Sequence, residues 1–136
     1  MSGSYSSLEE LLPHVRAATH QFLDQQCILA ITDLHGTIIY ANAAFSRISG
    51  YAREELIGRN HRLLKSGHHP PEFFREMWRT IARGEVWSGE ICNRARDGHH
   101  YWVESTISPL RDATGRTTHY CALRVDITAR KEAQQR

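Results

Sequence analysis

The sequence predicts a single α+β domain, with five antiparallel strands in one sheet and short helices gathered in a central insertion. The chain has 136 residues, which is the length of one domain and too short for two ordinary ones. Two strand patterns precede a stretch of short helical patterns, and three longer strand patterns follow it. In such a fold the helices cover one face of the sheet, and a ligand can lie between the two layers.

The first element expected is an amphipathic helix within residues 1–24, before the domain proper. Ser7 and Glu10 have the spacing of a capping box. Pro13 interrupts the helical pattern, so the regular helix starts either before Pro13 or at it. Apolar residues recur at helical spacing in this segment. They are Leu8, Leu11, Leu12, Val15, Ala18, Phe22 and Leu23.

The domain proper is expected to cover residues 25–128, and residues 129–136 to begin a helical output linker. Turn residues separate its apolar runs, and Asp97-Gly98 is a strong signal for a tight hairpin. Its helices are delimited by capping residues and by prolines at their starts. We expect five strands, at residues 27–32, 37–41, 86–96, 99–110 and 117–127. Between the second and third strands we expect a short helix between Asn42 and Gly50, a helical turn over 52–57, a loop or broken helix over 59–69, and a helix that Pro70-Pro71 opens and that ends before Gly84.

Composition excludes several classes of protein. Hydrophobic residues make up 40% and charged residues 24%, which is typical of a packed domain rather than a disordered one. We expect neither a transmembrane segment nor a secretory signal. The net charge is +2 and the basic residues are scattered, so no stripe for nucleic acid is expected. Cys27, Cys92 and Cys121 lack metal or disulfide spacing and indicate reduced positions in a cytoplasmic protein.

No motif of hydrolytic or transfer chemistry is present, so we do not expect this domain to be an enzyme by itself. The pairs His68-His69 and His99-His100 suggest metal binding at first sight. Adjacent histidines in a loop rarely converge on one ion, and no carboxylate or cysteine cluster accompanies them. We therefore expect no metal site.

A set of short motifs occurs in a fixed order over about residues 25–130. The motifs are Thr32-Asp33, Gly36, Ile39-Tyr40-Ala41-Asn42, Phe45, Ser49-Gly50-Tyr51, Glu55-Leu56-Ile57-Gly58, Trp87-Ser88-Gly89, Asn93-Arg94, Asp97-Gly98, Tyr101-Trp102, Pro109 and Asp126-Ile127-Thr128. Each motif alone is weak, but the set at these spacings resembles the PAS domain family specifically. The resemblance implies the PAS fold, with short helices on one face of the sheet.

A narrower resemblance concerns the segments 58–64, 77–78 and 86–94. They are similar to the FAD-binding PAS domains, a group that includes the aerotaxis receptor, the nitrogen-fixation regulator NifL and the sensor of methane monooxygenase regulation. They resemble the light-sensing LOV domains more distantly. A LOV domain has its adduct-forming cysteine where this chain has His61, and residues 58–69 contain no cysteine. The resemblance therefore implies a redox or energy sensor with FAD, with FMN and haem as less favoured cofactors.

Strand alternation combined with this resemblance gives cofactor-binding candidates on the strand 86–96. Trp87, Gly89, Ile91 and Asn93 share a face, which the resemblance directs toward the cofactor. Asn93 can donate and accept hydrogen bonds and suits the polar edge of a flavin ring; alternatively, it satisfies backbone groups near the hairpin. Trp87 either packs against the flavin or belongs to the core. Gly89 either admits a flat ring or marks a bulge.

Further candidates lie in the central helices and on the last strand. His61 and Arg62 suit the flavin or its pyrophosphate, or are a helix-terminal histidine and a solvated arginine. Asn60 either holds the loop or touches the ring, and Trp78 is either core or a cofactor contact. Arg124 stands where LOV domains have a glutamine beside the flavin, and a buried guanidinium needs a partner. Either a reduced flavin or a carboxylate such as Glu55 would serve.

The leading functional hypothesis is a flavin-binding sensor that signals through its exiting helix to an output module. The alternatives are a cofactor-free PAS module for dimerisation or docking, and a haem PAS gas sensor. We expect a homodimer formed through the N-terminal helix and the outer face of the sheet, where Cys121, Leu123 and Val125 alternate with the inward-facing residues. Either the N-terminal helix or a second subunit would cover this face.

Overall fold

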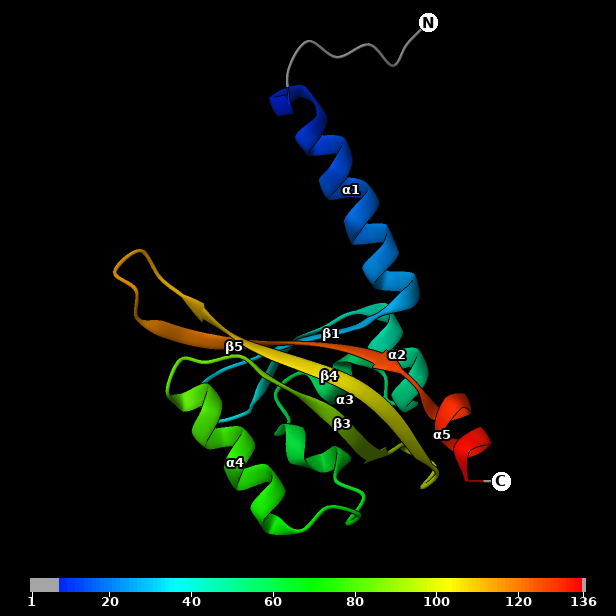
Figure 1. Cartoon of the computed structure of the whole chain (residues 1–136). Coiled ribbons are helices and arrows are strands. Elements are labelled where there is room, and N and C mark those ends of the chain that lie inside the picture. The colour runs from blue at the N-terminus through cyan, green and yellow to red at the C-terminus, as the bar shows by residue number, and fades with distance from the viewer. Residues whose placement is uncertain (1–7, 136) are drawn as a thin grey trace, which may run out of the picture.

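The computed structural model describes residues 8–135 and confirms the α+β class and the order of elements (Figure 1). Each strand lies within one or two residues of its expected bounds. The helical segments are α1 (Leu8–Gln26), α2 (Ala43–Ser49), α3 (Arg53–Leu56), the 3₁₀ helix η1 (His61–Leu64), α4 (Pro71–Ala82) and α5 (Thr128–Gln134). The strands are β1 (Ile28–Thr32), β2 (Ile38–Ala41), β3 (Trp87–Arg94), β4 (His100–Arg111) and β5 (Thr117–Asp126).

The five strands form one antiparallel sheet in the order β2-β1-β5-β4-β3. The first hairpin thus pairs with the last strand, and β5 lies at the centre. In Figure 1, α3 and α4 cover one face of the sheet. Phe45 of α2, Leu56 of α3 and Leu64 of η1 are fully buried there, so a contiguous apolar core fixes the helical layer on the sheet.

Local sequence explains where the short helices begin and end. The Asn42 side chain accepts from the Phe45 N–H, and Gly50 ends α2 with φ of 81°, a conformation that glycine adopts without strain. Asn60 caps η1 in the same way through Arg62 N–H. Pro71 opens α4 at a position where no N–H is needed.

The N-terminal helix differs from expectation in its position. It runs through Pro13, although a proline inside a helix loses one backbone hydrogen bond and its ring crowds the carbonyl of the preceding turn. Figure 1 shows α1 rising away from the sheet, and Phe22 is 55% exposed. Residues 1–7, including Ser7 of the expected capping box, lie outside the described residues. So do the side chains of Leu8, Leu11, Leu12, Val15 and Leu23.

The outer face of the sheet is therefore not covered by α1. Leu123 and Val125 of β5 are 40% and 48% exposed, and Ile39 of β2, two strands away, is exposed as well. The expectation that the chain's own N-terminal helix covers this face is wrong, because α1 points away from the sheet (Figure 1) and packs mainly against α2 and β1. Coverage by a second subunit stays a prediction.

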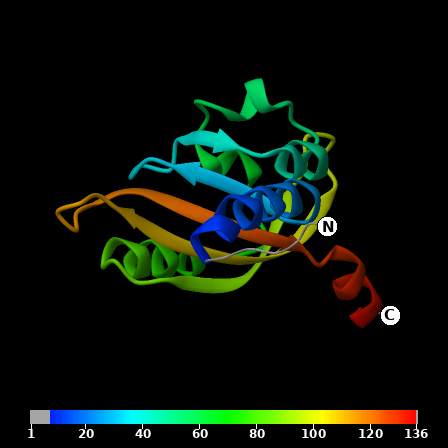
Figure 2. The ribbon, with the colours of Figure 1, turned by 90° about the horizontal axis from the view of Figure 1, so that it is seen from above.

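The exiting helix α5 projects from the end of β5 (Figure 2) and is fastened to β3 and β4. The Trp102 N–H donates to the Thr128 hydroxyl over 2.9 Å. The Lys131 ammonium lies 4.4 Å from the centroid of the Trp102 ring and 2.9 Å from a Glu90 carboxylate oxygen. No helix in residues 8–135 is both long and apolar enough to cross a lipid bilayer.

Candidate functional site

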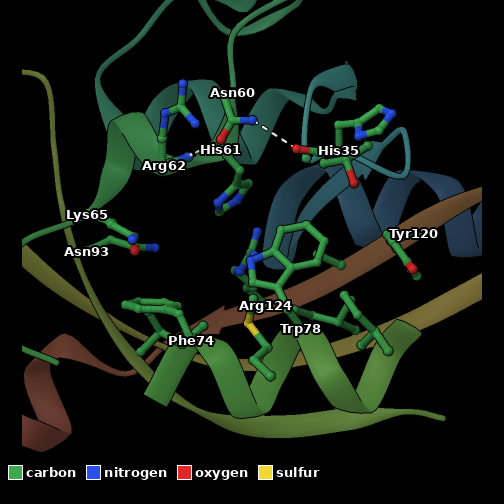
Figure 3. Close-up of a pocket in the computed structure, with 17 residues that line it drawn as sticks. His35, Asn60, His61, Arg62, Lys65, Phe74, Trp78, Asn93, Tyr120 and Arg124 are labelled. Carbon is green, nitrogen blue, oxygen red and sulfur yellow. Dashed lines mark hydrogen bonds between the residues drawn. The ribbon is translucent and has the colours of Figure 1, made fainter. Parts of the chain in front are cut away.

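A cavity of about 270 Å³ lies between the sheet and the helical layer (Figure 3). Its floor is the inner face of β3, β4 and β5, and its sides are η1, α4 and the turn of the β1–β2 hairpin. The apolar part of its wall comes from both layers: Phe74, Met77, Ile81, Ile91, Ile107 and Ala122. An apolar cavity with a few polar groups directed into it is the usual form of a small-molecule site.

Arg124 of β5 lies at the floor of this cavity and is only 4% exposed. Its Nε–H donates to the Ser105 hydroxyl over 3.1 Å. Among the atoms of the described residues, its Nη1 is buried without any hydrogen-bond partner. Burial lowers the pKa of the guanidinium to about 10, so it stays charged at pH 7. The expected alternative partner is wrong, because Glu55 instead pairs with Arg96 at 3.1 Å.

His61 of η1 faces Arg124 across the cavity (Figure 3). Its Nε2 is the other buried side-chain atom in the described part of the chain that lacks a hydrogen-bond partner. Burial lowers the pKa of His61 well below the ordinary 6.5, and the charge of Arg124 lowers it further. The imidazole is therefore neutral at pH 7. Unsatisfied buried polar atoms cost about 1–3 kcal/mol each, and a ligand in the cavity can satisfy both.

Asn93 of β3 and Tyr101 of β4 are paired in register, and both are buried. Burial raises the pKa of the Tyr101 phenol to about 12, although the neighbouring Asn93 side chain favours the ionised phenolate. Asn93 lines the cavity, as strand alternation predicts. It retains the capacity for further hydrogen bonds, because an amide offers two N–H donors and a carbonyl acceptor.

Asn60 and Trp78 shape one end of the cavity. The Asn60 amide donates to the His35 carbonyl over 3.0 Å, and its oxygen accepts from Arg62 N–H over 3.0 Å. Of the two alternatives for Asn60, the structure therefore shows it holding the loop. Trp78 is not a core residue, because it is partly exposed and lines the cavity. Its ring packs against the turn between β1 and β2 at Gly36. A Cβ at Gly36 would lie 3.3 Å from its ring.

Among residues 8–135, every charged side chain that lines the cavity is a cation. Arg62 and Lys65 are exposed residues that contribute to its lining, and the Lys65 ammonium lies 4.8 Å from the centroid of the Phe74 ring. His35 and His61 lie nearby. Within the part of the chain that the structure describes, no aspartate or glutamate lines the cavity. The site is therefore electrostatically suited to an anionic ligand.

Trp87 and Gly89 share the inward face of β3 as expected, but they do not line this cavity. The Trp87 ring packs edge-on against Phe73, with centroids 5.6 Å apart. A Cβ at Gly89 would come within 2.8 Å of the same indole. Gly89 does leave room for a flat ring, but that ring is the indole of Trp87. The core alternative describes Trp87 better than a cofactor contact does.

The histidine pair 68–69 seals an edge of the sheet. β3 is an edge strand, and the Cys92 N–H donates to His69 Nε2 over 2.9 Å. The His69 ring stacks on Phe73, with centroids 4.0 Å apart. The Ser66 hydroxyl donates to the Cys92 carbonyl over 2.8 Å. These contacts satisfy backbone groups that an open edge would expose.

Comparison with known proteins agrees with the geometry. A family model described as PAS domain matches residues 25–129. The chain belongs to the PAS domain family. A PAS fold explains why the sheet and the central helices enclose a cavity here, since the family resemblance implies this same layered arrangement.

The relatives of this PAS domain include sensory and regulatory proteins. It is 39% identical over 108 residues to the nitrogen fixation regulatory protein of Klebsiella pneumoniae, covering 79% of this chain and 22% of the relative. It is 34% identical over 116 residues to the aerotaxis receptor of Escherichia coli K12, covering 85% of this chain and 23% of the relative. The PAS domain therefore spans less than a quarter of either curated relative.

Solved structures also resemble this PAS domain. The structure of an RNA-binding light-oxygen-voltage receptor superposes with a TM-score of 0.78 and 32% identity, over 99% of this chain and 38% of that one. The match covers the sheet and the helical layer. It supports the fold and the place of the cavity within it.

Sequence reasoning missed several lining residues, among them Lys65, Phe74 and Tyr120. One usable signal was present: the segment 59–69 carries Arg59, His61, Arg62 and Lys65 without any acidic residue. Phe74 shares the apolar face of the α4 helix that the sequence predicted. Which residues on that face border a cavity depends on tertiary packing.

Proposed function

We propose that this PAS domain binds a flavin, most favourably FAD, in the cavity beneath α4 and senses the redox state of its surroundings. The single observation that carries the proposal is the pair of unpartnered buried atoms, Arg124 Nη1 and His61 Nε2, in one cavity. Bound flavin would supply a ring that takes up electrons and a proton. The related sensory proteins support the same proposal.

The residues present fit a flavin ring. The apolar wall suits the dimethylbenzene end of the ring, and Asn93, Arg124 and His61 supply polar groups for the other end. The volume of about 270 Å³ is close to the lower end of ligand sites, which begin at about 300 Å³. It accommodates a ring system and leaves the phosphates of a dinucleotide at the mouth. Arg62 and Lys65 are then suited to hold them.

Coupling to an output module is proposed to run along β5. Arg124 lies on the strand that leads directly into α5. Thr128, the first residue of α5, is bonded to Trp102 and to the Asp126 carboxylate. A rearrangement at Arg124 would therefore reach the start of α5 through one short segment of central strand. Local switching with a remote readout is a common device in sensors.

Dimerisation is proposed through the exposed outer face around Leu123 and Val125 together with α1. Apolar side chains left open on one face favour association, and a two-fold arrangement would place two α5 helices side by side. Light scattering on the intact chain and on a chain beginning at Gln25 tests both parts. A monomer at tens of micromolar for the intact chain contradicts the dimer, and an unchanged dimer after truncation contradicts the role of α1.

The cofactor proposal is tested by an absorption spectrum of purified protein and by chromatography of whatever it releases on denaturation. We expect the paired blue and near-ultraviolet bands of a flavin, and FAD rather than FMN in the released fraction. A sharp Soret band would replace the proposal by a haem sensor. A colourless protein that takes up no added FAD would leave a cofactor-free interaction module.

The three free cysteines are consistent with the proposed cytoplasmic location.

A further inference from the structure

Within residues 8–135, no carboxylate pairs with the buried guanidinium of Arg124. Its hydrogen-bond partner, the Ser105 hydroxyl, is neutral. The two titratable groups whose charge would favour it are Tyr101 and Cys121. Burial raises the pKa of Tyr101 to about 12 and also raises the pKa of the Cys121 thiol, so both are neutral at pH 7. His61, on the opposite side, is neutral as well.

We propose that Arg124 makes the cavity selective for a negatively charged ring, so that the reduced, anionic form of the bound flavin is held more tightly than the neutral oxidised form. This inference rests on the proposed function. It deepens it by naming the residue that distinguishes the two redox states. It follows from two observations: Arg124 lines the cavity (Figure 3), and its Nη1 is buried and unpartnered among the described residues.

The charge balance of the redox change fits this position. An external reductant, dithionite in the assay below, donates two electrons to the ring, and solvent supplies one proton. The neutral ring then carries one negative charge. The oxidised ring offers Arg124 only neutral acceptors, whereas the reduced ring offers an anionic one, so only the reduced ring adds a Coulomb attraction between opposite charges. Tighter binding of the reduced form raises the reduction potential of the bound flavin by linkage.

The low polarity of the site strengthens the effect. Arg124 and the inner side chains of β4 and β5 are buried, so water screens the charge weakly. The exposed cations Arg62 and Lys65 contribute to the lining of the cavity, where solvent and salt screen them. Arg124 is therefore the residue that distinguishes the redox states. Arg62 and Lys65 attract anionic groups in general.

The test measures the midpoint potential of the bound flavin against pH in the full chain, by titration with dithionite. Uptake of one proton with two electrons gives a slope of about 30 mV per tenfold change in proton concentration, and uptake of two protons gives about 59 mV. We expect the smaller slope in the wild-type protein. In Arg124→Gln we expect the larger slope, with the affinity for the reduced form falling tenfold or more relative to the oxidised form, a shift of at least about 30 mV.

Two matched variants separate charge from structure. Arg124→Lys keeps the charge and is expected to keep the small slope. Arg94→Gln removes an exposed cation of β3 that does not line the cavity and is expected to leave potential and slope unchanged. An equal shift in Arg94→Gln would overturn the assignment to Arg124, because it would mean that net charge alone sets the potential.

The outcomes distinguish the two proposals. A wild-type protein that binds oxidised flavin but takes up two protons per two electrons overturns the charge selectivity and leaves flavin binding intact. An Arg124→Gln variant with the wild-type slope does the same. A wild-type protein that binds no flavin overturns both. If Arg124→Gln does not fold, the wild-type slope alone decides.

Discussion

His61 and His69 lie in one short segment between α3 and α4, yet the fold puts them in opposite situations. His69 Nε2 accepts a hydrogen bond from the Cys92 N–H of the edge strand β3, and its ring stacks on Phe73. His61 Nε2 is buried without a partner among the described residues and faces a charged arginine. A satisfied histidine stabilises the fold, whereas an unsatisfied one is held in place by the fold for a ligand. The residue type does not distinguish these roles; only the partners do.

The largest expected effect is on stability, and its absence would contradict the contrast between His61 and His69. His69→Ala leaves the Cys92 N–H without its acceptor and removes a stacked ring, so the free energy of unfolding falls by about 2–4 kcal/mol. His61→Ala removes an unpartnered buried atom, which favours folding, and a ring that packs near Phe45, which opposes it. The stability of flavin-free protein therefore stays nearly unchanged. Denaturant unfolding of both variants measures this. A larger loss for His61→Ala than for His69→Ala would reverse the two roles.

The next effect concerns binding on β3. Asn93 lines the cavity, whereas Cys92 does not; the backbone of Cys92 bonds the loop at 66–69. Asn93→Ala removes a buried amide, so flavin affinity falls by about 1–3 kcal/mol. Cys92→Ala is the matched control at the neighbouring position and is expected to keep its flavin affinity. Fluorescence titration with FAD gives both values, and equal affinities in the two variants would show that Asn93 does not contact the ring.

A smaller effect is a pH dependence that separates the two histidines. The pKa of His61 is depressed in the folded state, so below pH 6.5 the unfolded chain binds a proton that the folded chain rejects. Stability of flavin-free protein therefore falls as pH decreases from 6.5, by at most about 1.4 kcal/mol per pH unit for this group. His61→Gln is expected to flatten this decline between pH 6.5 and 5. An unchanged decline would show that other groups, such as His69, account for it.

The smallest expected effect is the absence of a photochemical adduct. No cysteine among residues 8–135 lines the cavity, and a covalent bond to flavin of this kind needs a thiolate or thiol beside the ring. Blue light on flavin-loaded protein should give no bleached species with a single near-ultraviolet band that recovers in the dark. Photoreduction in the presence of an electron donor leaves this prediction intact; thermal recovery of a single-band species contradicts it.

Sequence patterns were sufficient for the sheet, because turn residues and alternation determine strands locally. They also placed Asn93 and Arg124 on the inward face. They also put Trp87 and Gly89 on one face, but alternation does not tell which neighbour fills the space beside a residue; here Trp87 itself occupies the space above Gly89. The partner of Arg124 was equally beyond the sequence. Glu55 is engaged by Arg96 from a hairpin far along the chain.

The most direct test of the central claim compares the two histidines and Arg124 in one experiment. Nitrogen-15 NMR of the flavin-free protein, followed by addition of FAD to saturation, reports on the His61 ring, the Arg124 guanidinium and the His69 ring together. We predict large shifts of the His61 and Arg124 signals, because their unpartnered atoms gain hydrogen bonds, and a His69 signal that stays in place. Saturable FAD binding with His61 and Arg124 unmoved would contradict the assignment of this cavity as the flavin site.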